Sequence, residues 1–402
     1  MLPFRFFARI AAPILVAAPA FIVAAHAQTP GISPTEIKFG QTLPYSGPAS
    51  AFAGNGRTQL AYFQQLNERG GINGRKLTLI SLDDAYSPPK TLEQTRKMVE
   101  QDNVAFIFAT LGTTPNRAIA KYLNTRKVPQ LLIGTTASGF ADPKSMPWTL
   151  GIMPTGEIEA ELYAKYILQA KPNAKIGVLF ANDDVGKTYL TGLKAGLGEK
   201  AKDMVVAEQS YELTDASIDS QIISLKAKGA DVLFDTAHPK FVTQAIKKVN
   251  ELGWQPLHIV VNTSSSIGMT LQPAGLDKAA GIVSAQYMKD PSDPQWASDP
   301  SMIEWLAFMK KYNPEGNTKD YMQVLATTQA QVLEHVLKNA GQDLSREKIM
   351  QAALSLKDLQ MPLLIPGVKI NTSATDLQPI KQMQMMRFDG AQWRLFGDIL
   401  SK

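Results

Sequence analysis

The pattern of apolar and polar positions is clearest in the first third of the chain. Two apolar runs of strand length each end in a small polar loop, and the segment between them carries apolar residues at helical spacing. Two strands joined through one helix should lie parallel and adjacent, so that both loops open at the carboxyl edge of the sheet, where open α/β sheets bind ligands. The predicted order is strand 104–108, loop 111–115, helix 116–126, strand 128–133 and loop 134–138.

The two polar loops are near copies, with Gly112-Thr113-Thr114 in the first and Gly134-Thr135-Thr136 in the second. Glycine lets a ligand approach the backbone, and threonine hydroxyls can donate beside the free N–H groups at a helix start. The motif therefore predicts a pocket for a small anion such as a carboxylate. One Gly-Thr pair after a strand is commonly only turn and N-cap chemistry, but its duplication on neighbouring strands favours a binding site.

The sequence on either side extends this unit into an alternating pattern of strands and helices. The turn residues Gly70-Gly71 and Asn73-Gly74 separate a helix from the next strand. The β-α-β-α-β order is typical of a doubly wound parallel sheet. The elements are strand 36–42, a helix with apolar Leu60, Phe63 and Leu66, strand 76–81 and helix 89–102.

A second α/β pattern begins near residue 156 and again places a polar loop after each strand. We therefore expect its loops to share one edge of a second sheet. The predicted elements are helix 157–170, strand 175–180, a helix ending at 200, strand 204–211, helix 218–228, strand 232–234, helix 241–252 and strand 257–261.

From residue 283 the chain is rich in Pro and Asp, and it then contains too few elements for a third domain. They should complete the two lobes, and a chain that crosses between lobes more than once forms a hinge suited to closure around a ligand. The predicted elements are helices 301–312, 320–339 and 346–356 and strand-like segments 367–370, 381–388 and 393–399. The predicted fold class is α/β with two doubly wound lobes, the first made of residues 28–155 plus 286–379 and the second of 156–285 plus 380–402.

Residues 1–27 have the pattern of a secretory signal peptide. Arg5 and Arg9 precede an apolar core, and Ala25-His26-Ala27 is a typical cleavage site. We expect export to the periplasm of a Gram-negative cell; the alternative, a membrane anchor, is disfavoured because the core is short and contains two prolines. The chain has no cysteine, so we expect neither disulfides nor a lipid anchor on an N-terminal Cys.

Charge and residue types argue against several classes of function. The formal net charge is +5, from 41 basic and 36 acidic residues without a basic run, so no nucleic-acid partner is expected. The histidines outside the signal segment, His238, His258 and His335, are far apart in the sequence. We therefore predict no metal site, no cofactor and no catalytic group.

Several motifs together resemble the periplasmic type I binding proteins for leucine, isoleucine and valine, which serve ATP-driven importers. They are Ser46-Gly47-Pro48, the Gly-Gly-Ile-x-Gly stretch within 66–75, Asp83-Asp84, Val128-Pro129 and Asp183-Asp184-x-Gly186. The resemblance spans nearly all of the mature chain. It implies two α/β lobes joined by three crossovers, a small ligand held between them, a membrane permease as partner and no enzymatic activity.

The resemblance also implies ligand contacts, position by position. The clamp for the ligand carboxylate falls on Gly112, Thr113, Thr135, Thr136 and Ala137, and an aromatic over the ligand side chain falls on Phe52. Contacts from the second lobe fall near Val185, Thr236, Ala237 and Thr263, and a late aromatic contact falls on Tyr321. Further candidates are Thr114, Asp235, His238 and Ser264.

Two positions depart from the amino-acid binders of this family. Val185 stands where they have an aromatic residue, and Thr263 stands where an acidic residue receives the ammonium group of the ligand. A buried ammonium without a carboxylate partner is strongly unfavourable. The sequence therefore favours a small aliphatic or aromatic carboxylate without an amino group, unless Asp235 points into the cleft and restores an amine site.

Other functions stay open at this point. A branched-chain or other amino-acid binding protein of the same importer class is one alternative, and a sensory protein of the same fold is another. Gly54-x-Gly56 is a weak signal for an exported dehydrogenase, because Gln59 replaces the third glycine of the fingerprint. The chain has no Gly-x-Ser-x-Gly motif that would favour a hydrolase. We expect a monomer that closes around its ligand.

Overall fold

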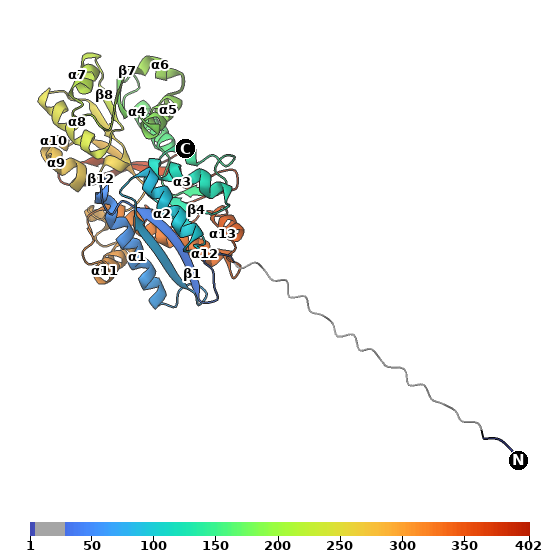
Figure 1. The fold of residues 1–402 in the computed structure, drawn as a ribbon. Coiled ribbons are helices and arrows are strands. Elements are labelled where there is room, and N and C mark those ends of the chain that lie inside the picture. The colour runs from blue at the N-terminus through green and yellow to red at the C-terminus, as the bar shows by residue number, and fades with distance from the viewer. Residues whose placement is uncertain (5–28) are drawn as a thin grey trace.

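The computed structural model describes residues 1–4 and 29–402. Residues 29–402 form two α/β lobes, one above the other in Figure 1, each built on its own sheet. The strand order is β2-β1-β3-β4-β5 in the first sheet and β12-β11-β10-β9-β8-β6-β7 in the second. The predicted fold class is confirmed. The predicted signal peptide, 1–27, lies outside the described residues apart from its first four.

The first sheet is parallel throughout and packs on α1 through an aromatic core. Phe39 of β1 stacks on Phe106 at 4.9 Å between ring centroids and meets Phe63 of α1 edge-on at 5.1 Å. The elements are β1 Glu36–Leu43, α1 Ala53–Glu68, β2 Lys76–Asp83, α2 Pro88–Glu100, β3 Ile107–Phe108, α3 Thr113–Thr125, β4 Gln130–Ile133 and β5 Thr149–Gly151.

The second sheet is parallel from β7 to β10, and β11 and β12 add two antiparallel strands. Helix α8 buries one apolar stripe, which includes Phe241, Ala245 and Val249. The elements are α4 Gly156–Ala170, β6 Ile176–Ala181, α5 Asp184–Leu197, α6 Ala201–Met204, β7 Val205–Tyr211, α7 Asp219–Ala227, β8 Val232–Asp235, α8 Pro239–Glu251, β9 Leu257–Val260, α9 Gln272–Ala274, α10 Leu276–Ala279, β10 Val283–Gln286, β11 Gln382–Phe388 and β12 Trp393–Ser401.

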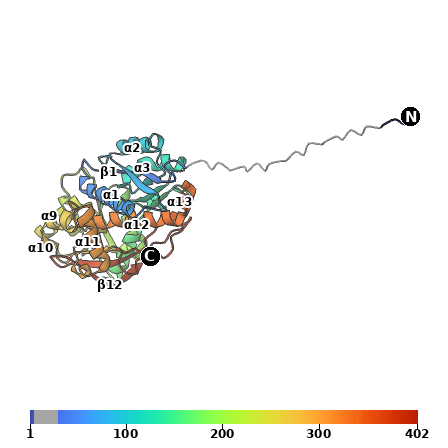
Figure 2. The same cartoon turned by 90° about the horizontal axis from the view of Figure 1, so that it is seen from below.

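The chain passes between the two sheets three times, after β5, after β10 and before β11. Between the last two crossings it forms α11 Pro300–Tyr312, α12 Tyr321–Ala340 and α13 Arg346–Ala353. Helix α12 packs along α1 of the first lobe, and Figure 2 shows the two side by side. The lobe boundaries given by the sequence stay a prediction.

Several details of the predicted elements are wrong. Residues 367–370 form no strand, and Ile370 makes only an isolated bridge to Leu359. The sequence pattern misses the short strands β5 and β10. The helix predicted from residue 116 begins at Thr113, so the first threonine pair forms a helical turn.

Candidate functional site

The two threonine segments meet at the carboxyl edge of the first sheet. β3 and β4 are parallel neighbours, and a bridge between Leu111 and Gly134 continues their pairing beyond the strands. The Gly112 N–H donates to the Gly134 carbonyl at 2.9 Å. The hydroxyls of Thr113 and Thr135, which occupy the same position in the two copies, lie 2.7 Å apart. The duplicated sequence therefore forms one hydroxyl pair.

This hydroxyl pair has one proton left for a ligand. The two hydroxyls carry two protons and use one in the bond between them, while Thr135 Oγ1 also accepts the Ala137 N–H at 3.2 Å. Both threonines are half-buried, and the exposed Thr114 follows them in the first turn of α3. N–H groups in this turn have no partner within the helix. The edge thus offers hydroxyl and backbone donors to an anion.

Beyond the hydroxyl pair the two copies differ. The second copy continues into a short 3-10 turn, Ser138–Phe140, and not into a long helix. Thr136 is buried, its carbonyl accepts the Gly156 N–H at 2.7 Å, and its hydroxyl reaches Tyr189 of the second lobe. Thr136 therefore faces the crossover between the lobes, and its part in a ligand clamp stays a prediction.

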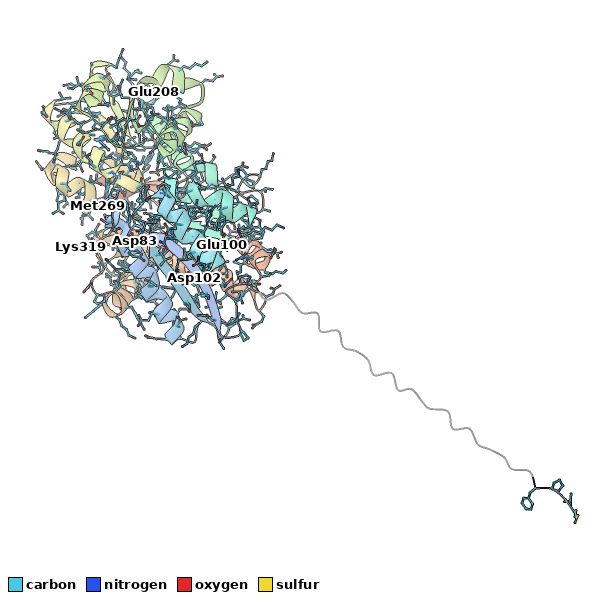
Figure 3. All side chains as sticks on the ribbon, viewed as in Figure 1. Asp83, Glu100, Asp102, Glu208, Met269 and Lys319 are labelled. Carbon is cyan, nitrogen blue, oxygen red and sulfur yellow. The ribbon has the colours of Figure 1, made fainter. Side chains whose placement is uncertain are left out.

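The carboxyl edge of the first sheet faces the second lobe. Asp83, which ends β2, and Met269 of the second lobe both lie near the border between the lobes in Figure 3. On the second lobe, the Thr236 hydroxyl donates to the Leu179 carbonyl at 3.1 Å. Thr263 is half-buried, and its hydroxyl has no hydrogen-bond partner in residues 29–402. Of these two hydroxyls, that of Thr263 is the one free to meet a ligand.

A third hydroxyl of the second lobe, that of Ser264, is already engaged. It donates to the Ala237 carbonyl at 2.7 Å, and both residues are buried. This bond ties the loop after β9 to the loop after β8. The two residues therefore shape the second-lobe edge, and their contact with a ligand stays a prediction.

Asp235 is buried with both oxygens engaged, which argues against an amine site at this residue. Its side chain is 0% exposed. One carboxylate oxygen accepts the Ala237 N–H at 3.0 Å, and the other lies 3.1 Å from Nε2 of His258. Both oxygens are engaged within the second lobe, so Asp235 is a structural residue of this lobe.

Residues far apart in the sequence join the lobes at this edge. Val185, at the start of α5, packs against a small apolar cluster of the first lobe that includes Ala137. Tyr321, which is 2% exposed, begins α12 and donates from its phenol to the Asn262 carbonyl at 2.9 Å. Phe52 lies half-buried before α1 and packs on the large core cluster, which holds residues of both lobes. The structure thus brings some predicted contacts together at the junction, and the contact of Phe52 with a ligand stays a prediction.

Tyr86, which the sequence does not single out, lies on the clamp. A Cβ atom on Gly112 would come within 2.4 Å of the Tyr86 ring. Burial, and then the negative charge of Asp183, raise the pKa of Tyr86. Asp183 caps α5 through the Gly186 N–H at 2.9 Å and lies 3.7 Å from Nε2 of His238. Tyr86 of the first lobe therefore approaches an Asp-His pair of the second.

A buried carboxylate connects the elements behind this junction. Glu159 of α4 is 1% exposed and accepts from the phenols of Tyr163 at 2.8 Å and Tyr189 at 2.7 Å and from the Asn262 N–H at 2.6 Å. Burial raises the pKa of Glu159. Because the Asn262 carbonyl also accepts from Tyr321, α12 is linked through this loop to α4.

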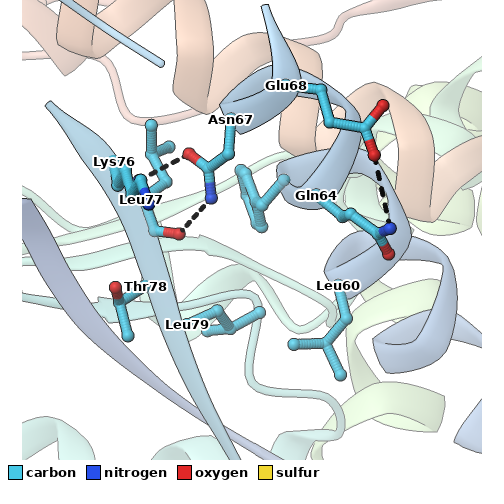
Figure 4. A pocket seen from close by; sticks show the side chains of 9 residues that line it. Leu60, Gln64, Asn67, Glu68, Lys76, Leu77, Thr78 and Leu79 are labelled. Atoms are coloured by element: carbon cyan, nitrogen blue, oxygen red, sulfur yellow. Dashed lines mark hydrogen bonds between the residues drawn. The ribbon is translucent and has the colours of Figure 1, made fainter. Parts of the chain in front are cut away.

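Neither of two cavities is lined by Thr113 or Thr135, but the second is lined by Ala137 of the predicted clamp. One, of about 480 Å³, lies on the first lobe between α1 and the edge strand β2, and Figure 4 shows Asn67 pairing there with the N–H and carbonyl of Leu77. Leu60, one of the apolar residues named for the helix in the sequence, is 40% exposed and lines this cavity. The other, of about 250 Å³, lies where α3 faces α4 and α5, and its lining includes an Arg117–Asp184 ion pair of 2.7 Å between the lobes.

The glycines that suggested a nucleotide site are packing residues. Gly54 and Gly56 lie inside α1, where a Cβ atom would come 2.4 Å from Gln323 and 2.0 Å from Tyr45. Residues 1–4 and 29–402 contain no group of three His, Cys, Asp or Glu side chains that could hold a metal ion. Over the same residues, every helix is too short or too polar to cross a bilayer.

Comparisons with known proteins agree with the architecture. A family model described as Periplasmic binding protein matches residues 36–392. Among curated relatives, Leu/Ile/Val-binding protein homolog 7 of Brucella abortus (strain 2308) is 25% identical over 340 residues, which are 81% of this chain and 82% of the relative.

Two solved structures share the fold. A branched chain amino acid ABC transporter from Thermus thermophilus with bound valine has a TM-score of 0.80 at 15% identity and covers 92% of this chain and 98% of its own. A fatty acid ABC transporter substrate-binding protein from Thermomonospora curvata has a TM-score of 0.76 at 18% identity, and the match covers 93% of this chain and 95% of that protein. Since the family model spans both lobes, the chain belongs to the periplasmic binding protein family and has its type I, two-lobed fold.

Proposed function

We propose that this protein is the substrate-binding subunit of an ABC importer and binds a small carboxylate between its lobes. The observation that carries the proposal is the Thr113–Thr135 hydroxyl pair, 2.7 Å apart beside the first turn of α3. Valine, bound in one structural neighbour, and a fatty acid, named for another, share a carboxylate. A common carboxylate clamp with a variable second half accounts for both ligands.

We further propose that the ligand lacks an amino group. Thr263 offers only a hydroxyl, which pairs with a hydroxyl or carbonyl but does not neutralise a buried cation. Asp235 is engaged with His258 and is closed to the ligand. An aliphatic or aromatic acid fits these groups, because it needs donors at one end only.

A branched-chain amino acid is the second candidate, favoured by the name of the curated relative. Its ammonium would need an acidic partner, and Asp183 is half-buried where the lobes meet. One oxygen of Asp183 accepts the Gly186 N–H and the other lies 3.7 Å from His238. Binding an ammonium there would therefore compete with contacts that Asp183 already makes.

In this role the mature chain, without residues 1–27, acts in the periplasm as a monomer and delivers its ligand to a membrane permease. Residues 28–155 plus 286–379 form one closing lobe and residues 156–285 plus 380–402 form the other. The crossovers after β5 and β10 and before β11 support this division. Their shared position between the sheets suits a hinge.

Isothermal titration calorimetry of the mature chain tests the proposal. The probes are 4-methyl-2-oxopentanoate, benzoate, octanoate and leucine at one pH and salt concentration. We expect at least one of the three acids to bind more tightly than leucine. Tight binding of leucine alone would establish the amino-acid candidate instead, and no binding of any probe would refute a carboxylate site.

A further inference from the structure

The segment after β2 holds two consecutive residues in an uncommon backbone conformation. Ala85 has φ of 51° and Tyr86 has φ of 58°, the left-handed region that non-glycine residues adopt at a cost. Hydrogen bonds hold the segment there. The carboxylate of Asp83 accepts the Ala85 N–H at 3.0 Å, that of Asp84 accepts the Tyr86 N–H at 2.9 Å, and the Asp84 carbonyl accepts the Ser87 N–H at 2.8 Å. Strain maintained by the surrounding structure in this way commonly marks a functional position.

The strained backbone aims the Tyr86 ring at the clamp. A Cβ atom built on Gly112 would lie 2.4 Å from Cε2 of Tyr86 and 2.8 Å from both Cζ and Oη. Gly112 is the N-cap residue of α3, directly before Thr113 of the hydroxyl pair. The ring therefore lies against the backbone of the clamp, where any larger residue would displace it.

The phenol of Tyr86 is a free donor at this place. Its hydroxyl has no hydrogen-bond partner in the described part of the chain, although the side chain is half-buried. Burial and the nearby charges of Asp183 and Asp84 raise its pKa, so it keeps its proton at neutral pH. The acidic groups of both lobes that face it thus favour a neutral phenol able to donate.

We propose that Tyr86 is a ligand-binding residue whose ring closes the carboxylate clamp over Gly112 and whose phenol donates a hydrogen bond to the bound acid. This inference rests on the proposed function, and it adds a third kind of donor to the threonine hydroxyls and the N–H groups of α3. All three are uncharged, so the clamp recognises a carboxylate by hydrogen bonds without a basic side chain. The Asp183 carboxylate beyond the phenol disfavours a second negative charge on the ligand at this end.

Two variants separate binding from a structural role. Tyr86→Phe keeps the ring and removes only the phenol. Tyr86→Gly removes the side chain and relieves the left-handed backbone but also loses the packing of the ring on the core, so the melting temperature of the ligand-free protein reports how much Tyr86 contributes to stability. Tyr122→Phe is the matched control, because the phenol of Tyr122 on α3 donates at 2.8 Å to Glu100 at the end of α2.

The test is calorimetric titration of the wild type and these variants with 4-methyl-2-oxopentanoate, benzoate and octanoate, together with melting curves of the ligand-free proteins. For whichever acid the wild type binds, Tyr86→Phe should lower the affinity about tenfold and Tyr86→Gly by more, while Tyr122→Phe changes nothing. Wild-type affinity in both Tyr86 variants would overturn the inference and leave the proposed function standing. A lower melting temperature of Tyr86→Gly with unchanged affinity of Tyr86→Phe would make Tyr86 structural. Absence of binding by the wild type would refute the proposed function, and this inference with it.

Discussion

Replacing the hydroxyl pair by methyl groups should weaken carboxylate binding in a characteristic, unequal way. Valine has nearly the shape of threonine, so Thr113→Val and Thr135→Val remove a hydroxyl with little change in packing. In either single variant, the remaining hydroxyl has no neighbouring hydroxyl to bond with, so it can donate its proton to the ligand. Only the double variant removes both protons of the pair.

The magnitudes follow from the bonds that each variant loses. A single variant loses the neutral bond between the two threonines, which orients the outward proton and contributes about 0.5–1.5 kcal/mol. The double variant also loses the hydrogen bond to the charged ligand, which contributes about 1.5–3 kcal/mol. We therefore expect a loss of affinity of at most about tenfold in each single variant and about 10- to 150-fold beyond that in the double variant.

Titration calorimetry with the tightest-binding acid measures these losses, and Thr110→Val is the control. The Thr110 hydroxyl lies near the end of β3, is buried and has no hydrogen-bond partner within residues 29–402. Its replacement should leave the affinity unchanged and should not lower the melting temperature, because an unpaired buried hydroxyl is unfavourable.

Two results would refute this reasoning. If one single variant lost as much affinity as the double variant, one threonine alone would hold the ligand and the shared proton would be a wrong description. If the double variant bound like the wild type, the carboxylate would lie elsewhere in the junction.

Three further predictions concern stability and shape. Glu159→Ala leaves the Tyr189 phenol and the Asn262 N–H without their acceptor in a buried site, so the free energy of unfolding should fall by about 2–6 kcal/mol in urea titrations; a fall below about 1 kcal/mol would contradict the described network. For Asp299, burial raises the pKa of the carboxyl group, but the hydrogen bonds from Lys289 and Ser301 outweigh burial and lower this pKa to about 2 from its usual 3.8. Asp299 therefore stabilises the fold above pH 4 and loses this effect as the pH falls toward 2, so that Asp299→Asn should be less stable than wild type at pH 7, with a difference that shrinks below pH 4; a difference independent of pH would oppose this. Small-angle scattering should show a smaller radius of gyration with a saturating acid, and an unchanged radius would argue against closure of the lobes.

The local pattern of the sequence determined the order of elements and the neighbouring loops. Two strands joined by one helix usually lie parallel and adjacent in the same sheet. The apolar runs around 104–108 and 128–133 are joined in this way, and β3 and β4 form the expected parallel pair. The repeated Gly-Thr-Thr motif was therefore enough to predict that Thr113 and Thr135 share one edge of the sheet. The two-lobed fold was predictable for the same reason, since each α/β unit is read from its own periodicity.

Tertiary structure alone decided which side chains are free at that edge. Asp235 is closed to a ligand because His258, on the next strand, pairs with it in the second lobe. Thr136 turns to the crossover because the start of α4 and Tyr189 lie beside it. These partners lie between about 20 and 53 residues away along the chain. Helix and strand periodicity relates only residues a few positions apart, so it does not predict a contact at such sequence separations.

Tyr86 shows the same limit most clearly. Its only sequence signal is a position after Asp83-Asp84, which serve as acceptors for the backbone of the turn. That the ring reaches Gly112 depends on the left-handed backbone at 85–86 and on the packing of the loops after β2 and β3 against each other. The sequence therefore determined where the two threonine segments meet, whereas long-range packing determined which donors lie free beside them, because a contact between distant residues is fixed by the whole fold and not by the residues alone.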